Sequence, residues 1–146
     1  TVYGGGKVGL MGVLANSVLV GGGKIMGVIP ERLQAREIAH EHLTELFVVD
    51  SMHARKAMMA HLADAYIVLP GGVGTLEEAF EAVTAFHLGP HKKPVGFLNI
   101  AGYFDKLLGF LEHSYESGFL YEPSRELLAS AADPELLLKQ LEKMAL

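Results

Sequence analysis

The sequence predicts an α/β fold, in which helices cover both faces of a parallel β-sheet. Short apolar runs alternate with stretches of helical periodicity, and glycine clusters follow two of the runs. Parallel neighbours need a crossover connection, which a helix supplies. A run such as Tyr66–Leu69 (YIVL) is apolar throughout, as expected for a strand buried on both faces. The predicted fold class is therefore a Rossmann-like, doubly wound parallel sheet.

The chain has 146 residues, half of them hydrophobic, so we expect a single domain over 1–146. The formal net charge is -5 and the signs are mixed, which argues against a nucleic acid polymer as partner. No cysteine is present, so thiolate metal sites and disulfides are excluded. No apolar stretch approaches the roughly 20 residues that cross a bilayer, and no signal peptide is recognisable. We expect a cytoplasmic protein with no membrane partner.

Six apolar runs predict strands, and five stretches with apolar residues at helical spacing predict helices. The strands are Thr1–Tyr3, Lys24–Ile29, Leu46–Val49, Tyr66–Leu69, Val95–Leu98 and a weaker run at Leu127–Ala129. The helices are Gly9–Leu19, Met52–Ala63, Thr75–His87, Tyr103–Ser117 and Pro134–Met144. The segment from Pro30 to Glu45 has no clear period, and a long polar loop in a compact domain is often functional.

The first glycine cluster, YGGGKVGLMG, follows a strand and opens a helix. Gly4, Gly6 and Gly9 satisfy the pattern G-x-G-x-x-G of dinucleotide-binding turns. Such glycines either adopt positive φ angles without any ligand or let backbone N–H groups approach a phosphate, and the pattern alone leaves both interpretations open. On the second interpretation, the turn from Gly4 to Gly9, Gly5 included, binds the phosphate.

The second cluster, PGGVGT, repeats this arrangement after another strand. Open α/β sheets bind ligands at the carboxyl ends of their strands, and two glycine turns there point to one crevice. A classical NAD domain needs one such loop, so the pair favours a mononucleotide held from two sides. We expect the backbone N–H groups of Gly71–Thr75 to bind its phosphate at a helix start.

Charged residues stand at the beginning of two predicted helices. Thr75 and Glu78 match the capping box S/T-x-x-E, which leaves the adjacent Glu77 unexplained. Arg55 and Lys56 lie in the first turn of the helix before, where the helix dipole opposes cations. On one interpretation these two cations are simply solvated. On the other they pair with a ligand anion or with Glu77 and Glu78.

We expect no metal and no cofactor, and we expect the protein to form a homodimer. The seven histidines form no metal-ligand spacing, so we predict no metal site. The predicted helix Thr75–His87 carries Phe80, Val83, Thr84 and Phe86 on more than one face. That is more apolar surface than one sheet face covers, which predicts a homodimer or a larger homo-oligomer.

The segments GGGKVGLMG, MHARK and PGGVGTLEE, in this order and at these intervals, resemble the Lonely guy (LOG) family. These are cytokinin riboside 5'-monophosphate phosphoribohydrolases, often mislabelled as lysine decarboxylases. The resemblance runs from Thr1 to the C-terminus. Family members carry a further strand and helix before VYGGG, and this chain begins with an apolar strand and no Met, so we expect that part to be missing here.

The resemblance implies a hydrolase of cytokinin biosynthesis, an N-glycosidase that cleaves adenine-type nucleoside 5'-monophosphates into free base and ribose 5-phosphate. Arg55 and Glu78 match the catalytic pair. A carboxylate can stabilise the oxocarbenium-like transition state and orient or deprotonate water, if an arginine keeps it ionised. The positions that match substrate contacts are Glu37, Lys56, Gly72, Val73, Gly74, Thr75, Leu76, Glu77 and Thr84.

Two rival functions remain at this stage. A non-catalytic nucleotide-binding carrier or sensor would share the fold, although a pure binder of an anion has no need of Glu78 with Arg55. An NAD-dependent oxidoreductase would need a substrate domain, for which 146 residues leave no room. Near Thr84 the family often has a bulky aromatic, whereas this chain reads VTAFHLG, so the sequence leaves the choice between AMP and its prenylated analogue open.

Overall fold

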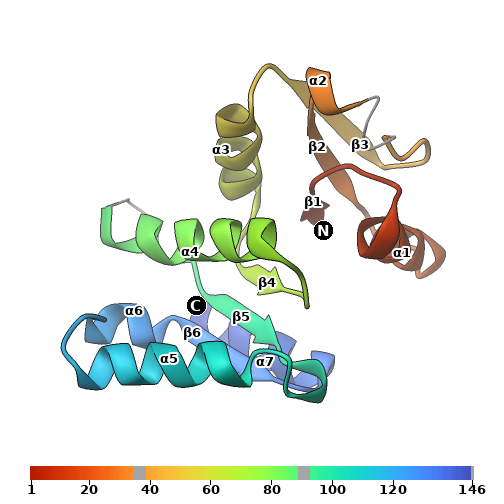
Figure 1. The fold of residues 1–146 in the computed structure, drawn as a ribbon. Coiled ribbons are helices and arrows are strands. Elements are labelled where there is room, and N and C mark those ends of the chain that lie inside the picture. The colour runs from red at the N-terminus through yellow and green to blue at the C-terminus, as the bar shows by residue number, and fades with distance from the viewer. Residues whose placement is uncertain (35–38, 89–92, 146) are drawn as a thin grey trace. The chain divides into compact units, whose positions relative to one another are not determined.

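The computed structural model describes residues 1–34, 39–88 and 93–145, and Figure 1 shows its fold. The chain forms two compact units, Thr1–Ala63 (unit 1) and Asp64–Leu146 (unit 2). Each unit contains a three-stranded parallel sheet, with strand orders β1-β2-β3 and β4-β5-β6. Parallel strands joined through helices are the components of a doubly wound, Rossmann-like fold, so the predicted fold class is confirmed.

Unit 1 combines its sheet with the helices α1, α2 and α3. Helix α3 contacts all three strands, while α1 contributes Ala15 to a core cluster with Tyr3 and Ile25. In chain order the elements are β1 (Val2–Tyr3), α1 (Gly9–Val20), β2 (Met26–Pro30), α2 (Glu31–Gln34), β3 (Glu45–Val49) and α3 (Met52–Leu62).

Unit 2 contains the remaining strands, and its sheet is covered on both faces. In chain order the elements are β4 (Tyr66–Val68), α4 (Val73–Leu88), β5 (Val95–Leu98), the 3-10 turn η1 (Ile100–Gly102), α5 (Asp105–Glu116), α6 (Glu122–Glu126), β6 (Leu128–Ala131) and α7 (Pro134–Ala145).

Alternation along β5 explains the two covered faces. Val95 and Phe97 belong to one core cluster with Ala79 and Ala82 of α4. The residue between them is Gly96, where an added Cβ would meet Leu137 and Leu141 of α7. Successive strand residues point to opposite faces, so α4 packs on one face of the sheet and α7 on the other.

The predicted strands and long helices are confirmed, with boundaries that differ by at most two residues. Two short helices, α2 and α6, were not predicted, and α2 lies inside the segment Pro30–Glu45 that was predicted as a loop. Helix α4 begins at Val73, two residues earlier than predicted, which matters for the site. In the described residues no helix is long and apolar enough to cross a membrane. The single domain over 1–146 stays a prediction.

Candidate active site

The first glycine loop follows β1 in unit 1, and its glycines have distinct structural reasons. Gly5 and Gly9 have positive φ angles of 80° and 63°, which side chains rarely adopt. At Gly4 an added Cβ would overlap the guanidinium of Arg55. The alternative interpretation, glycines required by backbone geometry, therefore holds for Gly5 and Gly9, while Gly4 is required by the close approach of a side chain.

Three consecutive carbonyl groups of this loop accept hydrogen bonds from the protein. The Gly4 oxygen accepts from Arg55 Nη2 at 2.7 Å, the Gly5 oxygen from the His40 N–H at 3.0 Å and the Gly6 oxygen from the Tyr3 hydroxyl at 3.0 Å. Burial raises the pKa of Tyr3 to about 12, so this hydroxyl stays protonated as a donor at neutral pH. A trans peptide directs its N–H opposite to its C=O, so the following N–H groups point away from these three donors.

Arg55 is a buried residue of unit 1 that connects the first glycine loop to β2. Its side chain is only 6% exposed, its Nε donates to the Val28 oxygen at 3.0 Å, and its Nη2 donates to Gly4. The Ser51 side chain caps α3 by accepting from the Ala54 N–H at 3.1 Å, which sets the first turn that carries Arg55. The planar guanidinium therefore joins the loop that follows β1 to the middle of β2, a fork geometry that lysine cannot supply.

The second glycine loop follows β4 in unit 2 and begins α4. The Gly72 oxygen accepts from the Leu76 N–H at 3.2 Å, which makes Gly72 the N-cap of this helix. The Gly71 oxygen accepts from the Tyr103 hydroxyl at 2.7 Å. An added Cβ at Gly71 would overlap the Thr75 hydroxyl.

Gly72 and Gly74, unlike Gly4, Gly5, Gly9 and Gly71, have no evident structural requirement for glycine. Neither has a positive φ, and an added Cβ at either position meets no described atom within 4 Å. The first turn of an α-helix has N–H groups without intrahelical partners, and the helix dipole favours an anion there. Glycines at these two positions leave the backbone open to a ligand.

The capping-box interpretation of Thr75 and Glu78 does not hold in the structure. With Gly72 as N-cap, Thr75 lies within the first turn of α4 and Glu78 in the following residues of the helix. Both Glu77 and Glu78 are exposed, and so is Thr84, whose hydroxyl donates back to the Phe80 oxygen at 2.7 Å.

The predicted site residues are divided between the two units, and the structure adds Tyr103 to them. Arg55, Lys56 and the first glycine loop lie in unit 1, whereas the residues from Gly71 to Glu78 and Thr84 lie in unit 2. Glu37 lies outside the described residues. Tyr103, which contacts Gly71, was missed, because only the pairing of β4 with β5 brings its loop beside the second glycine loop. No cluster of three potential metal ligands occurs in the described part of the chain.

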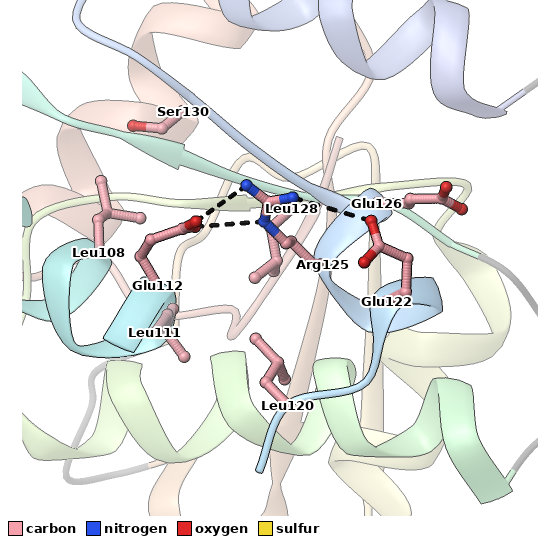
Figure 2. A pocket seen from close by; sticks show the side chains of 9 residues that line it. All are labelled: Leu108, Leu111, Glu112, Leu120, Glu122, Arg125, Glu126, Leu128 and Ser130. Atoms are coloured by element: carbon pink, nitrogen blue, oxygen red, sulfur yellow. Dashed lines mark hydrogen bonds and ion pairs between the residues drawn. The ribbon is translucent and has the colours of Figure 1, made fainter. Parts of the chain in front are cut away.

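A pocket of about 430 Å³ lies elsewhere in unit 2 and contains none of the predicted site residues (Figure 2). Across it, Arg125 makes two hydrogen bonds to Glu112, at 2.9 and 3.2 Å, and an ion pair of 3.8 Å with Glu122. Arg125, Glu112 and Glu122 are thus engaged with one another. The residues that line it are Leu108, Leu111, Glu112, Leu120, Glu122, Arg125, Glu126, Leu128 and Ser130.

Comparisons with known proteins agree with the motifs. The family described as "Possible lysine decarboxylase" matches residues 11–141. Cytokinin riboside 5'-monophosphate phosphoribohydrolase LOG7 of Arabidopsis thaliana is 49% identical over 142 residues, which are 97% of this chain and 65% of the relative. LOG1 of the same plant is 48% identical over 141 residues, 97% of this chain and 66% of the relative.

A relative of the same printed name, LOG from Oryza sativa subsp. japonica, is 47% identical over 142 residues, which are 97% of this chain and 59% of that protein. The chain therefore spans between 59% and 66% of the length of these three relatives.

Replacing Arg55 by alanine should destabilise the protein. The buried Gly4 and Val28 carbonyls would lose charged donors, and an orphaned buried acceptor costs about 1–3 kcal/mol. We expect the free energy of unfolding, measured by urea denaturation, to fall by about 2 kcal/mol or more. The control is His53→Ala, an exposed residue of the same turn, which should change it by less than about 0.5 kcal/mol. Equal and small effects would contradict the structural role of Arg55.

Proposed function

This chain belongs to the LOG family, whose members are also described as possible lysine decarboxylases, and on that premise we propose that it is a phosphoribohydrolase. The reaction is hydrolysis of the N-glycosidic bond of an adenine-type nucleoside 5'-monophosphate, which gives the free base and ribose 5-phosphate. The observation that carries the proposal is the start of α4, where glycines with no structural requirement precede two exposed carboxylates. The printed names of the relatives support the same reaction.

The phosphate of the substrate binds at backbone N–H groups in this proposal. Those of Gly72, Val73, Gly74 and Thr75 belong to the beginning of a 16-residue helix, where partial positive charge accumulates. The N–H groups of the loop from Gly4 to Gly9 contribute further donors. Neutral donors held by the fold bind a dianion without a metal, and we propose no cofactor.

Glu78 acts on the ribose rather than on the phosphate. As the glycosidic bond breaks, positive charge develops at the anomeric carbon, and a carboxylate stabilises it while it orients or deprotonates the attacking water. The proposal retains Arg55 as the second member of the catalytic pair. It retains Lys56, Glu77, Leu76, Thr84 and Glu37 as substrate contacts.

The active form is proposed to be a homodimer. The substrate is a single nucleoside monophosphate, either AMP or its prenylated analogue. Incubating the full-length protein with each compound and measuring the free base by chromatography separates the two substrates.

Replacing Glu78 by glutamine should reduce kcat by about 10²-fold or more, because the charge that stabilises the transition state is lost. Binding of the monophosphate should persist or become tighter, because a negative charge near an anion has been removed. Glu78 is exposed and glutamine keeps its shape, so the melting temperature should change by less than about 2 °C.

Kinetics of the purified Glu78→Gln variant measure kcat and the binding of the monophosphate, and thermal melting measures the melting temperature. A near-normal kcat would end the catalytic assignment. A wild-type protein that binds the monophosphate and releases no base would instead indicate a nucleotide carrier or sensor.

Replacing Gly74 by alanine should raise stability and lower activity together. Gly74 lies in the first turn of α4, where alanine favours the helix by roughly 0.5–1 kcal/mol, and its Cβ meets no described atom. That Cβ would occupy the space through which a phosphate approaches the backbone, so we expect kcat/KM to fall by about tenfold or more.

The matched control is Gly109→Ala in the interior of α5, another exposed helical glycine whose added Cβ meets no described atom. It should give a similar gain in the free energy of unfolding and leave kcat/KM unchanged. If Gly74→Ala stabilised the protein and kept full activity, the phosphate would have to bind elsewhere.

A further inference from the structure

The hydrogen bond between Tyr103 and the second glycine loop leads to one more assignment. We propose that Tyr103 is a positioning residue: its hydroxyl fixes the peptide between Gly71 and Gly72 so that the Gly72 N–H is directed at the substrate phosphate. The proposal rests on the proposed function. The bond has an ordinary O–H···O length, with 2.7 Å between the Tyr103 hydroxyl and the Gly71 oxygen, and joins the loop after β5 to the loop after β4.

A peptide flanked by two glycines needs such an anchor. Without Cβ atoms on either side, rotation of the Gly71–Gly72 peptide plane meets little steric resistance. The peptide is planar and trans, so holding the Gly71 oxygen toward Tyr103 directs the Gly72 N–H to the opposite side. The hydroxyl of Tyr103 thereby selects which side of the loop presents a donor.

The turn that carries Tyr103 is itself held in an unusual backbone conformation. Ala101 has a φ of 51° and Gly102 a φ of 71°, and this left-handed conformation is unfavourable for a non-glycine residue such as Ala101. The Asn99 side chain compensates: its Oδ1 accepts from the Phe104 N–H at 2.7 Å, and its Nδ2 donates to Asp105 Oδ1 at 2.7 Å. Strain that persists because its surroundings hold it is characteristic of functional sites.

The ring of Tyr103 is connected to the core through its neighbour. It meets the Phe104 ring edge-to-face at 5.0 Å, and Phe104, which is 2% exposed, meets Phe97 in the same way at 5.2 Å. The Tyr103 side chain itself is 56% exposed. An exposed hydrogen bond adds little to stability, so its removal should leave folding intact and reveal any effect on binding.

The test is Tyr103→Phe, which keeps the ring contacts and removes only the hydroxyl. In the full chain we expect the KM for the nucleoside monophosphate and the Kd for ribose 5-phosphate to rise together by about 5- to 20-fold. The value of kcat should stay within about twofold, because Glu78 is untouched, and the melting temperature within about 2 °C. Tyr115→Phe is the matched control, since it also deletes a tyrosine hydroxyl that donates to a neighbour, Glu122, and should leave KM and Kd unchanged.

Unchanged KM and Kd in Tyr103→Phe, or equal increases in Tyr115→Phe, would overturn the assignment. Calorimetric binding of ribose 5-phosphate needs no turnover. A wild-type protein without turnover, but with phosphate affinity that depends on Tyr103, would therefore refute the proposed reaction and support the positioning role. A wild-type protein that does not bind ribose 5-phosphate would refute both.

Discussion

A planar peptide cannot turn its carbonyl and its N–H independently, and this constraint governs both glycine loops. In each loop a side chain of the protein holds a glycine carbonyl: Arg55 holds that of Gly4, Tyr3 that of Gly6 and Tyr103 that of Gly71. Glycine supplies close approach and positive φ angles at the expense of backbone entropy. The three side-chain donors remove that freedom again, so that the direction of the N–H groups is fixed before any ligand binds.

Arg55 and Glu78 are both charged residues near the start of a helix, but the structure places them in different surroundings. Arg55 is buried and bound to two main-chain oxygens, so its loss affects the fold as well as any reaction. Glu78 is exposed on α4 and has no capping role. Loss of activity in an Arg55 variant therefore needs a measurement of stability beside it, whereas a Glu78 variant reports more directly on chemistry.

Alternating apolar runs and helical periodicity were enough to predict the parallel sheets, because burial on two faces leaves a strong pattern. Helices α2 and α6 have four and five residues, too few for a helical period to appear. The start of α4 was misplaced because Thr75 and Glu78 fit a capping box, while the actual N-cap, Gly72, has no side chain to signal it. Tyr103 and the buried contacts of Arg55 were missed since they depend on which strands lie side by side, which local sequence does not encode.

The central claim is that backbone N–H groups at the beginning of α4 bind the phosphate of a nucleotide. Glycine-selective ¹⁵N labelling, followed by titration with ribose 5-phosphate, observes those groups directly. The account predicts that the amide resonances of Gly72 and Gly74 move in a saturable manner, while those of Gly109 and Gly118, which lie in and after α5, stay in place. Saturable binding that leaves Gly72 and Gly74 unmoved would contradict it.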